Sequence, residues 1–381
     1  MPADIAARLR DMPSDALRPI LGKILETDAQ PVEGWSVTEI GRSVGMSTAG
    51  IFQVSGRATT AAGEEPWSTV VKVFGQPRIN ERGFDAMGLE RELEVYRSGQ
   101  VGFQGSRVRP PDCYALETWQ DMHFVWLEDL SGAPQAPWLP EYFIPTARDF
   151  GQFNGHWSGA SLPAWSWLSP DGLRAKYWSP QHAERLSRLD SLRADPLGGL
   201  ALPEDVFAGL VQLERDGEGL VSKVETTTKC FCHRDCHAKN LFPIPDTGDG
   251  ITTVAIDWNR AGIEYLGADV GQLLASATKW LELTIEQAYS LVDPVCDAYL
   301  AGLAGIGWSG NEDEMRLTYL TCLGLGEASR MTRLIAMAVD RPESRANTER
   351  LMLHPMEEIF ERWASVLRFC LAQKDRAMQL L

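Results

Sequence analysis

The chain has 381 residues, with 36 lysines and arginines against 52 aspartates and glutamates, and a formal net charge of −16 at pH 7. This length allows two domains, or one domain of two lobes, with a large buried core. The negative charge argues against a nucleic-acid partner, which requires a basic footprint. It suits a cationic small substrate, although solubility alone also explains an acidic surface. No apolar run approaches a membrane span, and the residues from Met1 to Asp4 do not begin a basic region followed by an apolar one, so we expect a cytoplasmic protein without a membrane partner.

The first third of the chain is predicted to be mostly strand after a helical lead-in at residues 1–35. Runs rich in β-branched residues then alternate with turn signals, and one amphipathic helix interrupts them. The expected strands are 36–40, 51–55, 67–74, 114–116 and 123–127, and the expected helix is 84–98.

A proline-rich stretch from Pro134 to Pro140 marks a change from strand to helix. Helical patterns follow it, interrupted by a hairpin-like segment at 230–260. The expected helices are 146–158, 180–193, 203–226 and several from 267 to the end. We therefore expect two parts, a nucleotide-binding part at residues 1–130 and a helical part at residues 131–381.

The strongest motif is FCHRDCHAKN at residues 231–240, followed by a β-branched run that ends at Asp257. Asp235 and Asn240 are five residues apart in this motif. An aspartate, an asparagine and a second aspartate in this order are typical of kinases. There, one carboxylate receives the proton of the attacking hydroxyl, and the other two groups bind Mg²⁺ against the nucleotide phosphates. We predict Asp235 as the catalytic base and Asn240 and Asp257 as metal ligands.

Lys72 and Glu92 are predicted to act together upstream of this motif. Lys72 lies in an apolar strand, where a buried ammonium group needs an anionic partner. Glu92 lies beside the apolar stripe of the 84–98 helix, so it can face inward. In a kinase such a pair orients the nucleotide phosphates. The alternative is a solvent-facing lysine on an edge strand.

Two more segments are predicted to contact the nucleotide. Small residues between Gly41 and Gly50 let backbone N–H groups approach phosphates, and Ser47 and Thr48 are the candidates there. The backbone of Glu128 and Leu130, next to the change from strand to helix, is predicted to pair with the adenine edge.

These residues resemble the aminoglycoside phosphotransferase and choline kinase-like family. HRDCHAKN at 233–240 is similar to the family's His-Gly-Asp-x-His-x-x-Asn segment, and IDW at 256–258 to its Ile-Asp-Trp. RELEVY at 91–96 resembles its Arg-Glu-x-x-x-Tyr helix. The resemblance covers about residues 38 to 275. It implies an α+β, bilobal protein-kinase-like fold, in which a small antiparallel-sheet lobe carries one key helix and a larger lobe is mostly helical.

The resemblance also implies an activity, which is ATP- and Mg²⁺-dependent transfer of the γ-phosphoryl group to a hydroxyl of a small molecule. Asp269 would brace the predicted catalytic loop, which is the segment of residues 233–240. Arg234 departs from the family, because it replaces the usual glycine and gives the His-Arg-Asp of protein kinases. Trp258 after Asp257, and the lack of an Ala-Pro-Glu segment, favour a small-molecule kinase over a protein kinase. A catalytically silent nucleotide-binding protein is a further alternative, although no predicted site residue is missing.

The acceptor stays open among aminoglycosides, macrolides, choline-like compounds and other alcohols, and so does the oligomeric state. Tryptophans in the helical part could cage a cation together with carboxylates, line a pocket for a bulky apolar alcohol, or pack in the core. The tryptophans are Trp157, Trp165, Trp167, Trp178, Trp280 and Trp308, and the acidic residues are Asp269, Asp293, Asp297 and Glu312.

A zinc cluster from the Cys and His residues at 230–237 is disfavoured, because no second cluster supplies paired ligands.

Overall fold

The computed structural model describes residues 2–41, 48–75, 88–103, 105–169, 172–179, 184, 186–246 and 250–381. The chain divides into two compact units. The smaller unit contains Met1–Gly102 and Pro110–Ala133, and the larger contains Phe103–Arg109 and Pro134–Leu381. The short segment Phe103–Arg109 therefore belongs with the larger unit, although the chain on both sides of it belongs to the smaller one.

An antiparallel sheet forms the smaller unit. Its strands follow the order β1, β3, β4, β7, β6, and β2 pairs with β3 off this path. The strands are β1 (Gln30–Pro31), β2 (Ser36–Gly41), β3 (Thr48–Thr60), β4 (Gly63–Phe74), β6 (Cys113–Trp119) and β7 (Met122–Glu128). The helices are α1 (Pro2–Arg10), α2 (Ser14–Ile24) and α3 (Gly88–Ser98).

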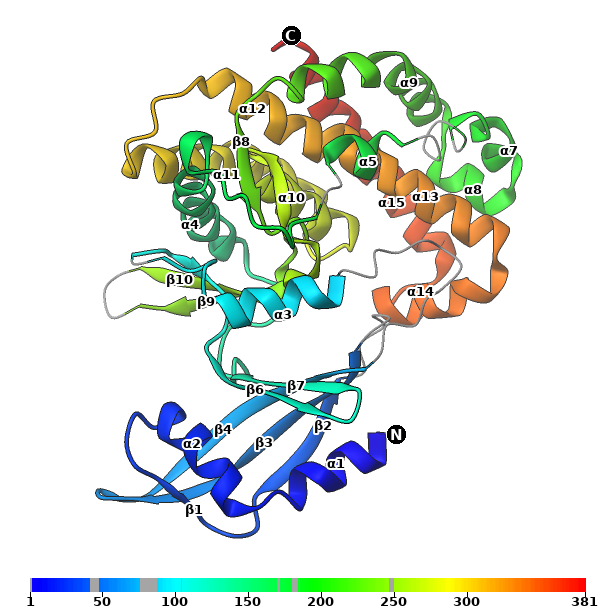
Figure 1. Cartoon of the computed structure of the whole chain (residues 1–381). Helices are drawn as coiled ribbons and strands as arrows, with labels where there is room; N and C mark the ends of the chain where they lie inside the picture. Colours follow the sequence, from blue (N-terminus) through cyan, green and yellow to red (C-terminus); the bar gives the residue numbers. More distant parts are fainter. Residues whose placement is uncertain are drawn as a thin grey trace. The chain divides into compact units, whose positions relative to one another are not determined.

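The two faces of this sheet pack against different helices, because successive side chains of a strand point to opposite faces. Val71 and Val73 belong to the cluster that contains the buried residues of α1 and α2, and Figure 1 shows these two helices lying against the sheet. Phe74 instead packs with Leu93 of α3. Lys72 alternates with Val71 and Val73, so its side chain points to the face that α3 covers.

Helices dominate the larger unit, as Figure 1 shows. They are α4 (Phe143–His156), α5 (Leu173–Tyr177), α7 (Leu189–Ala194), α8 (Pro196–Ala201), α9 (Glu204–Val224), α10 (Ala268–Lys279), α11 (Ile285–Gly305), α12 (Glu312–Thr321), α13 (Glu327–Asp340), α14 (Arg345–Met352) and α15 (Met356–Met378). Short 3₁₀ turns are η1 (Pro140–Tyr142), η2 (Gly159–Ser161), η3 (Ala238–Asn240), η4 (Trp258–Arg260) and η6 (Pro342–Ser344). A π-helical turn, η5 (Cys322–Gly326), joins α12 to α13 without a break.

Two small sheets carry the motif residues of the larger unit. β8 (Lys229–Cys232) pairs antiparallel with β11 (Gly262–Tyr265). β9 (Leu241–Pro245) and β10 (Ile251–Ala255) form a hairpin, and β5 (Val108–Arg109) adds to β10 in parallel.

Helices α4 and α11 cross at very short range. A Cβ at Gly151 would lie 2.1 Å from the Tyr299 carbonyl oxygen, and one at Gly302 would lie 2.1 Å from the Arg148 carbonyl oxygen. Only glycine permits this approach. The close crossing brings the Tyr299 hydroxyl within 3.1 Å of the Asn154 side chain.

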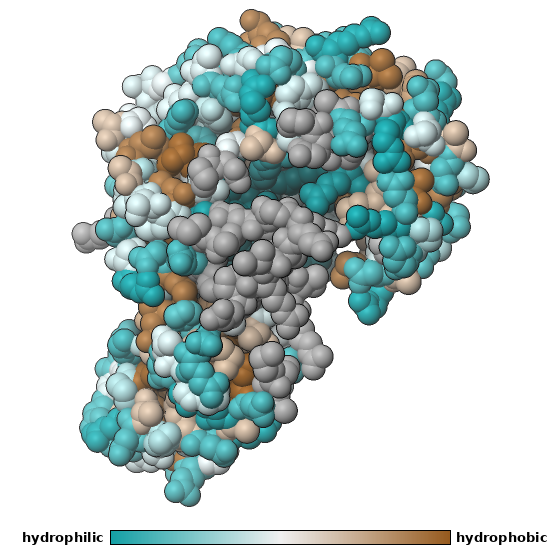
Figure 2. Space-filling view, turned by 45° about the vertical axis from the view of Figure 1, so that its right-hand side comes forward, coloured by the Kyte–Doolittle hydropathy of each residue, from teal (hydrophilic) through white to brown (hydrophobic). Residues whose placement is uncertain are grey.

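No helix in the described ranges is both long enough and apolar enough to cross a membrane. The space-filling view shows hydrophilic and apolar residues interspersed over the visible face (Figure 2).

Candidate active site

Lys72 and Glu92 form an ion pair inside the smaller unit. The Lys72 Nζ lies 2.8 and 2.9 Å from the two carboxylate oxygens of Glu92. The Lys72 side chain is 12% exposed and that of Glu92 is 2% exposed. Because β4 lies between β3 and β7, Lys72 is on an interior strand, not on an edge strand. The pairing expected from the sequence is present, and its role toward a nucleotide stays a prediction.

The other predicted nucleotide contacts of this unit are only partly described. Thr48 is the first residue of β3 and lies opposite Phe74 of β4. Ser47 lies outside the described residues.

Glu128 and Leu130 follow each other closely at the end of β7. The Glu128 N–H donates to the Asp112 carbonyl at 2.9 Å, and the Leu130 carbonyl accepts from the Ala133 N–H at 3.0 Å. These two backbone groups are therefore already bonded within the smaller unit, and the pairing of this segment with adenine stays a prediction.

Asp129, between these residues, was not predicted as a site residue. Its Oδ2 accepts hydrogen bonds from Gln53 Nε2 at 2.8 Å and from the Ser68 hydroxyl, and its Oδ1 accepts from the Ser131 N–H at 2.9 Å. Burial opposes ionisation of Asp129, but the hydrogen bonds from Ser68 and Gln53 outweigh it and lower the pKa. Asp129 thus fixes the end of β7 to β3 and β4.

In the larger unit, Asp235 has different neighbours at its two carboxylate oxygens. Asn240 Nδ2 donates to Oδ2 at 3.3 Å, and Gln272 Nε2 lies 3.5 Å from Oδ1. His237 Nε2 is 3.7 Å from Oδ2. Burial opposes ionisation, but the nearby imidazole of His237, with the charge of Arg260, holds the pKa of Asp235 well below its ordinary value. The side chain is 25% exposed, so an ionised carboxylate is accessible.

Asp269, at the start of α10, holds the backbone of the catalytic loop. Its Oδ2 accepts from the His233 N–H at 3.0 Å and its Oδ1 from the Arg234 N–H at 2.9 Å. Asn154 Nδ2 also lies 3.3 Å from Oδ2, and Asn154 is itself held by Tyr299. The close crossing of α4 and α11 is thereby connected to the shape of this loop.

We expect Asp269→Asn to lower the stability of the larger unit by about 2–4 kcal/mol, because an amide nitrogen would face backbone donors in a buried place. Urea unfolding should show a lower midpoint, and the His233 and Arg234 amides should exchange hydrogen faster. Asp190, which is exposed, gives the control Asp190→Asn with an unchanged midpoint. Unchanged exchange at His233 and Arg234 would contradict the bracing role.

Arg234 shows how this chain tolerates a side chain where the family has glycine. Its φ is +67°, a left-handed conformation that costs a non-glycine residue about 1 kcal/mol or more. Its Nε lies 3.1 Å from Glu264 Oε1, and both side chains are buried. A Cβ on Gly262 would lie 2.7 Å from Arg234 Nη1, so Gly262 leaves room for the guanidinium group.

His233 is a buried support of the loop. Its Nε2 lies 2.8 Å from the Ile256 carbonyl oxygen, so this nitrogen carries the proton, and Nδ1 accepts from the Asp235 N–H at 3.3 Å. Burial lowers the pKa of His233, which keeps the ring neutral. The ring connects the catalytic loop to the strand that ends before Asp257.

Asn240 and Asp257 lie at the same end of the β9–β10 hairpin. The Ile256 N–H donates to the Asn240 carbonyl at 2.9 Å, which ties the two segments together. Asn240 turns its Nδ2 toward Asp235, so its Oδ1 points away from that carboxylate. Asp257 has φ +64° and ψ +53°, and Asn259 Nδ2 donates to its Oδ1 at 2.9 Å. An amide oxygen and a carboxylate suit Mg²⁺, which prefers oxygen ligands.

The cysteines in and just before the catalytic loop pack in the interior of the larger unit. Cys230, Cys232 and Cys236 are buried, and burial raises the pKa of each thiol. Among the described residues no group of three or more Cys, His, Asp or Glu side chains is arranged to hold a metal ion.

The tryptophans of the larger unit contact their own chain. Trp165 stacks on Trp167 at 4.9 Å between ring centres and meets Trp157 and Phe231 edge-on, both at 5.2 Å. The ring of Trp280 lies under Lys279 and Lys239, with the ammonium nitrogens 5.2 and 5.8 Å from its centre. These contacts favour the packing interpretation.

The acidic residues expected beside those tryptophans also have partners. Asp293 pairs with Arg376 at 2.5 Å and Asp297 with Arg316 at 2.9 Å, while Asp269 holds the catalytic loop. Two of the carboxylates considered for a cage around a cationic substrate, Asp293 and Asp297, are therefore each already paired with an arginine of the same chain, which favours the packing alternative for the tryptophans.

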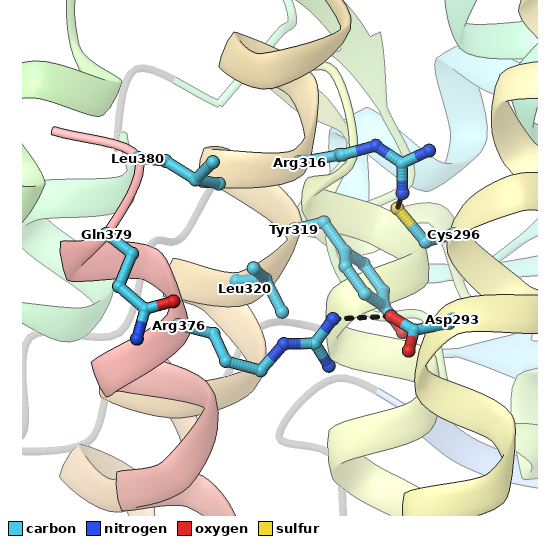
Figure 3. Close-up of a pocket in the computed structure, with 8 residues that line it drawn as sticks. All are labelled: Asp293, Cys296, Arg316, Tyr319, Leu320, Arg376, Gln379 and Leu380. Carbon is cyan, nitrogen blue, oxygen red and sulfur yellow. Dashed lines mark hydrogen bonds and ion pairs between the residues drawn. The ribbon is translucent and has the colours of Figure 1, made fainter.

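A hollow of about 190 Å³ lies between α11, α12 and the end of the chain. Figure 3 shows Arg376 reaching Asp293, and Arg316 reaching Cys296, across it. Its lining residues are Asp293, Cys296, Arg316, Tyr319, Leu320, Arg376, Gln379 and Leu380. None of them is a predicted catalytic, nucleotide-binding or metal-binding residue, although Asp293 is one of the acidic residues considered for the cation cage.

Comparison with known proteins identifies the family. The model of a phosphotransferase enzyme family matches residues 99–309. No curated protein sequence matches the chain significantly. An aminoglycoside phosphotransferase from Alicyclobacillus acidocaldarius subsp. acidocaldarius DSM 446 has a TM-score of 0.51 and 13% identity, covering 85% of this chain and 90% of that chain.

Two further structures are similar at lower scores. A choline kinase from Cryptosporidium parvum Iowa II has a TM-score of 0.48 and 14% identity, over 91% of this chain and 90% of that one. An amicoumacin kinase in complex with AMP-PNP and Ca²⁺ has a TM-score of 0.44 and 14% identity, over 84% and 88%. The expected α+β, protein-kinase-like fold is confirmed. Because the family model spans more than half of the sequence, the chain belongs to the phosphotransferase enzyme family.

Proposed function

We propose that the protein transfers the γ-phosphoryl group of ATP, with Mg²⁺, to a hydroxyl group of a small molecule. The observation that carries this proposal is the arrangement around Asp235. An accessible, ionised carboxylate contacts Asn240, and Asn240 is tied to the segment that ends at Asp257. Family membership supports the reaction class.

Asp235 would orient the acceptor hydroxyl and take its proton. In the transfer the bond between the β,γ-bridging oxygen and the γ-phosphorus breaks, the acceptor oxygen bonds to that phosphorus, and ADP leaves. Because the pKa of Asp235 lies below its ordinary value, the carboxylate is a weak base. It gains the proton once the new bond makes the acceptor oxygen acidic, which fits a loose transition state.

Asn240 and Asp257 would hold Mg²⁺ through an amide oxygen and a carboxylate. Bound there, the ion would neutralise charge on the β- and γ-phosphates. Lys72, held by Glu92, would supply a cation for the α- and β-phosphates.

We expect Lys72→Met to raise the KM for ATP by about tenfold or more, because a charged hydrogen bond to phosphate is lost. It should also destabilise the smaller unit, since Glu92 would stay buried without its cation. The double variant Lys72→Met/Glu92→Gln should regain stability and still bind ATP weakly. Steady-state kinetics and thermal unfolding separate the two effects, with exposed Lys223→Met as the control. An unchanged KM in the double variant would contradict the nucleotide role.

An ADP-release screen tests the proposed function. Purified protein with ATP and Mg²⁺ is given aminoglycosides, macrolides, choline, simple sugars, steroid alcohols and hydroxy acids. We expect ADP release that depends on one acceptor class and on Asp235. Nucleotide binding without acceptor-dependent release in any class would favour a silent nucleotide-binding protein.

A further inference from the structure

Two cations of the larger unit share one aromatic ring beside the catalytic loop. Tyr177, the last residue of α5, is buried. The Lys176 Nζ lies 5.2 Å from its ring centre, and the Arg330 guanidinium carbon lies 5.1 Å from it. The two charges are therefore no more than about 10 Å apart. Like charges this close repel each other unless anions compensate them.

Two buried carboxylates lie near this pair, and each already pairs with an arginine or lysine, Arg330 itself included. Glu327 is shared by Lys279 at 2.9 Å and Arg330 at 3.4 Å. Glu264 pairs with Arg234 at 3.1 Å.

Lys176 itself bonds only to neutral oxygens among the described residues. Its Nζ lies 2.9 Å from the Arg234 carbonyl oxygen and 2.7 Å from Gln272 Oε1. An ammonium group has three donors, so one N–H of Lys176 has no protein acceptor in the described structure. Burial and the charge of Arg330 lower the pKa of Lys176, and a bound anion would oppose that effect.

The exposed side of this cluster presents the two cations next to Asp235, whose charge acts on both of them. The carboxylates lie inside, with side-chain exposures of 1% for Glu327 and 3% for Glu264. Lys176 is half-buried, and the Arg330 side chain is 22% exposed. A solvent-borne group therefore meets the two cations before it meets either carboxylate.

This cluster adjoins one oxygen of Asp235. Gln272 accepts from Lys176 at 2.7 Å and lies 3.5 Å from Asp235 Oδ1. Asn240, the predicted metal ligand, contacts the other oxygen, Oδ2. Lys176 is thus linked through Gln272 to the carboxylate oxygen of Asp235 that Asn240 does not contact, and Arg330 lies over the ring that Lys176 shares.

The π-helical turn η5 contributes to this placement. It ends at Gly326, directly before Glu327, and a Cβ on Gly326 would lie 3.2 Å from the Tyr177 ring. π-Turns within α-helices often occur at functional sites. Here the turn precedes the first turn of α13, which carries both Glu327 and Arg330.

We propose that Lys176 and Arg330 bind an anionic group, a carboxylate or a phosphate, of the acceptor whose hydroxyl group Asp235 engages. This inference rests on the proposed function and deepens it. The acceptor is then a hydroxy acid or a phosphorylated alcohol, and its anionic group binds on the Oδ1 side of Asp235, away from Asn240.

Anion binding can be measured without turnover. With AMP-PNP and Mg²⁺ filling the nucleotide sites, the thermal unfolding temperature is followed while sulfate replaces chloride at constant ionic strength. Ligand binding raises this temperature by mass action. We expect Lys176→Met and Arg330→Met each to weaken sulfate binding by about tenfold, the loss of one charge-assisted contact.

Matched variants control for charge and folding. Arg333 is exposed on the same helix, so Arg333→Met removes an equal charge and should leave sulfate binding unchanged, as should Lys223→Met. Lys176→Arg keeps the charge and should retain binding. The proposal would be overturned if sulfate raised the unfolding temperature equally in all variants, or if sulfate did not bind the wild type.

A matched series of acceptors identifies the anionic group. Glycerate, glycerol 3-phosphate, glycerol and 3-aminopropane-1,2-diol share one carbon skeleton and differ in charge. We expect the two anionic compounds to bind tightest, as acceptors or as inhibitors of acceptor turnover, and to lose this advantage in Lys176→Met. Whichever of glycerate and glycerol 3-phosphate binds more tightly shows whether the site prefers a carboxylate or a phosphate. Equal binding of the aminodiol would overturn the proposal.

The nucleotide itself is the competing source of an anion. If Lys176→Met weakened AMP-PNP binding and left ADP binding unchanged, the pair would contact the γ-phosphoryl group, and the acceptor assignment would be wrong. Asp235→Asn separates the two proposals, because it should stop turnover and still bind sulfate. Failure of AMP-PNP to bind the wild type would instead contradict the proposed function.

Discussion

Asp235→Asn should lower kcat by about a thousandfold or more, while ATP still binds. An amide can hydrogen-bond to the acceptor hydroxyl but cannot take its proton. The predicted nucleotide contacts, Lys72 and Asp257, are unchanged in this variant. Single-turnover ADP formation and calorimetric titration with AMP-PNP measure the two quantities separately.

The matched controls for this variant are already in the chain. Exposed Asp190→Asn makes the same chemical change and should leave kcat unaltered. His237→Gln removes a group that lowers the pKa of Asp235, so its effect should be smaller and should change the pH profile in the acid range. Near-normal turnover in Asp235→Asn would rule out the catalytic role.

Asp257→Asn should reduce activity by about a hundredfold or more and raise the Mg²⁺ concentration required, since metal stabilisation of transition-state charge is worth several kcal/mol. Asparagine tolerates the left-handed backbone that Asp257 adopts, so the fold should persist. Titrating activity with Mg²⁺ measures the concentration that is required, and circular dichroism of the variant shows whether it is folded.

Asp257→Ala provides the comparison for backbone strain. Alanine is less favourable at positive φ by about 1–2 kcal/mol. This variant should therefore be less stable to unfolding and should also need a higher Mg²⁺ concentration for activity. If Asp257→Asn had the wild-type magnesium dependence, Asp257 would not be a metal ligand.

The predictable part of the molecule is the part encoded by local pattern. Alternating apolar residues around Lys72 and the apolar stripe beside Glu92 indicate which side chains share a face. The ion pair between them follows from that geometry. The order and spacing of Asp235, Asn240 and Asp257 in the sequence likewise indicate the loops in which the predicted site residues lie. Their chemical roles stay predictions until the variants are measured.

The remainder depends on contacts between distant segments. Lys176 reaches Gln272 and Arg234 across 96 and 58 residues, and nothing near Lys176 in the sequence signals those partners. The two-residue strand β5 pairs with β10 far along the chain, so Phe103–Arg109 carries no recognisable pattern. The ion pair of Asp293 is of the same kind, because its partner Arg376 is 83 residues away in the sequence.

If Arg330 binds the acceptor as proposed, the continuous run of α12, η5 and α13 makes its placement depend on helical phase. In an α-helix each residue turns the chain by about 100°, and the wider π-turn changes the phase between the residues before and after it. Deleting Gly324 would return the run to α-helical winding and turn Arg330 and Glu327 by about one residue's rotation relative to α12. The side-chain chemistry would be intact, yet Arg330 would leave the Tyr177 ring. Under the proposed acceptor site, an insertion or deletion within the five residues of η5 would therefore change acceptor selectivity without replacing any residue that touches the acceptor.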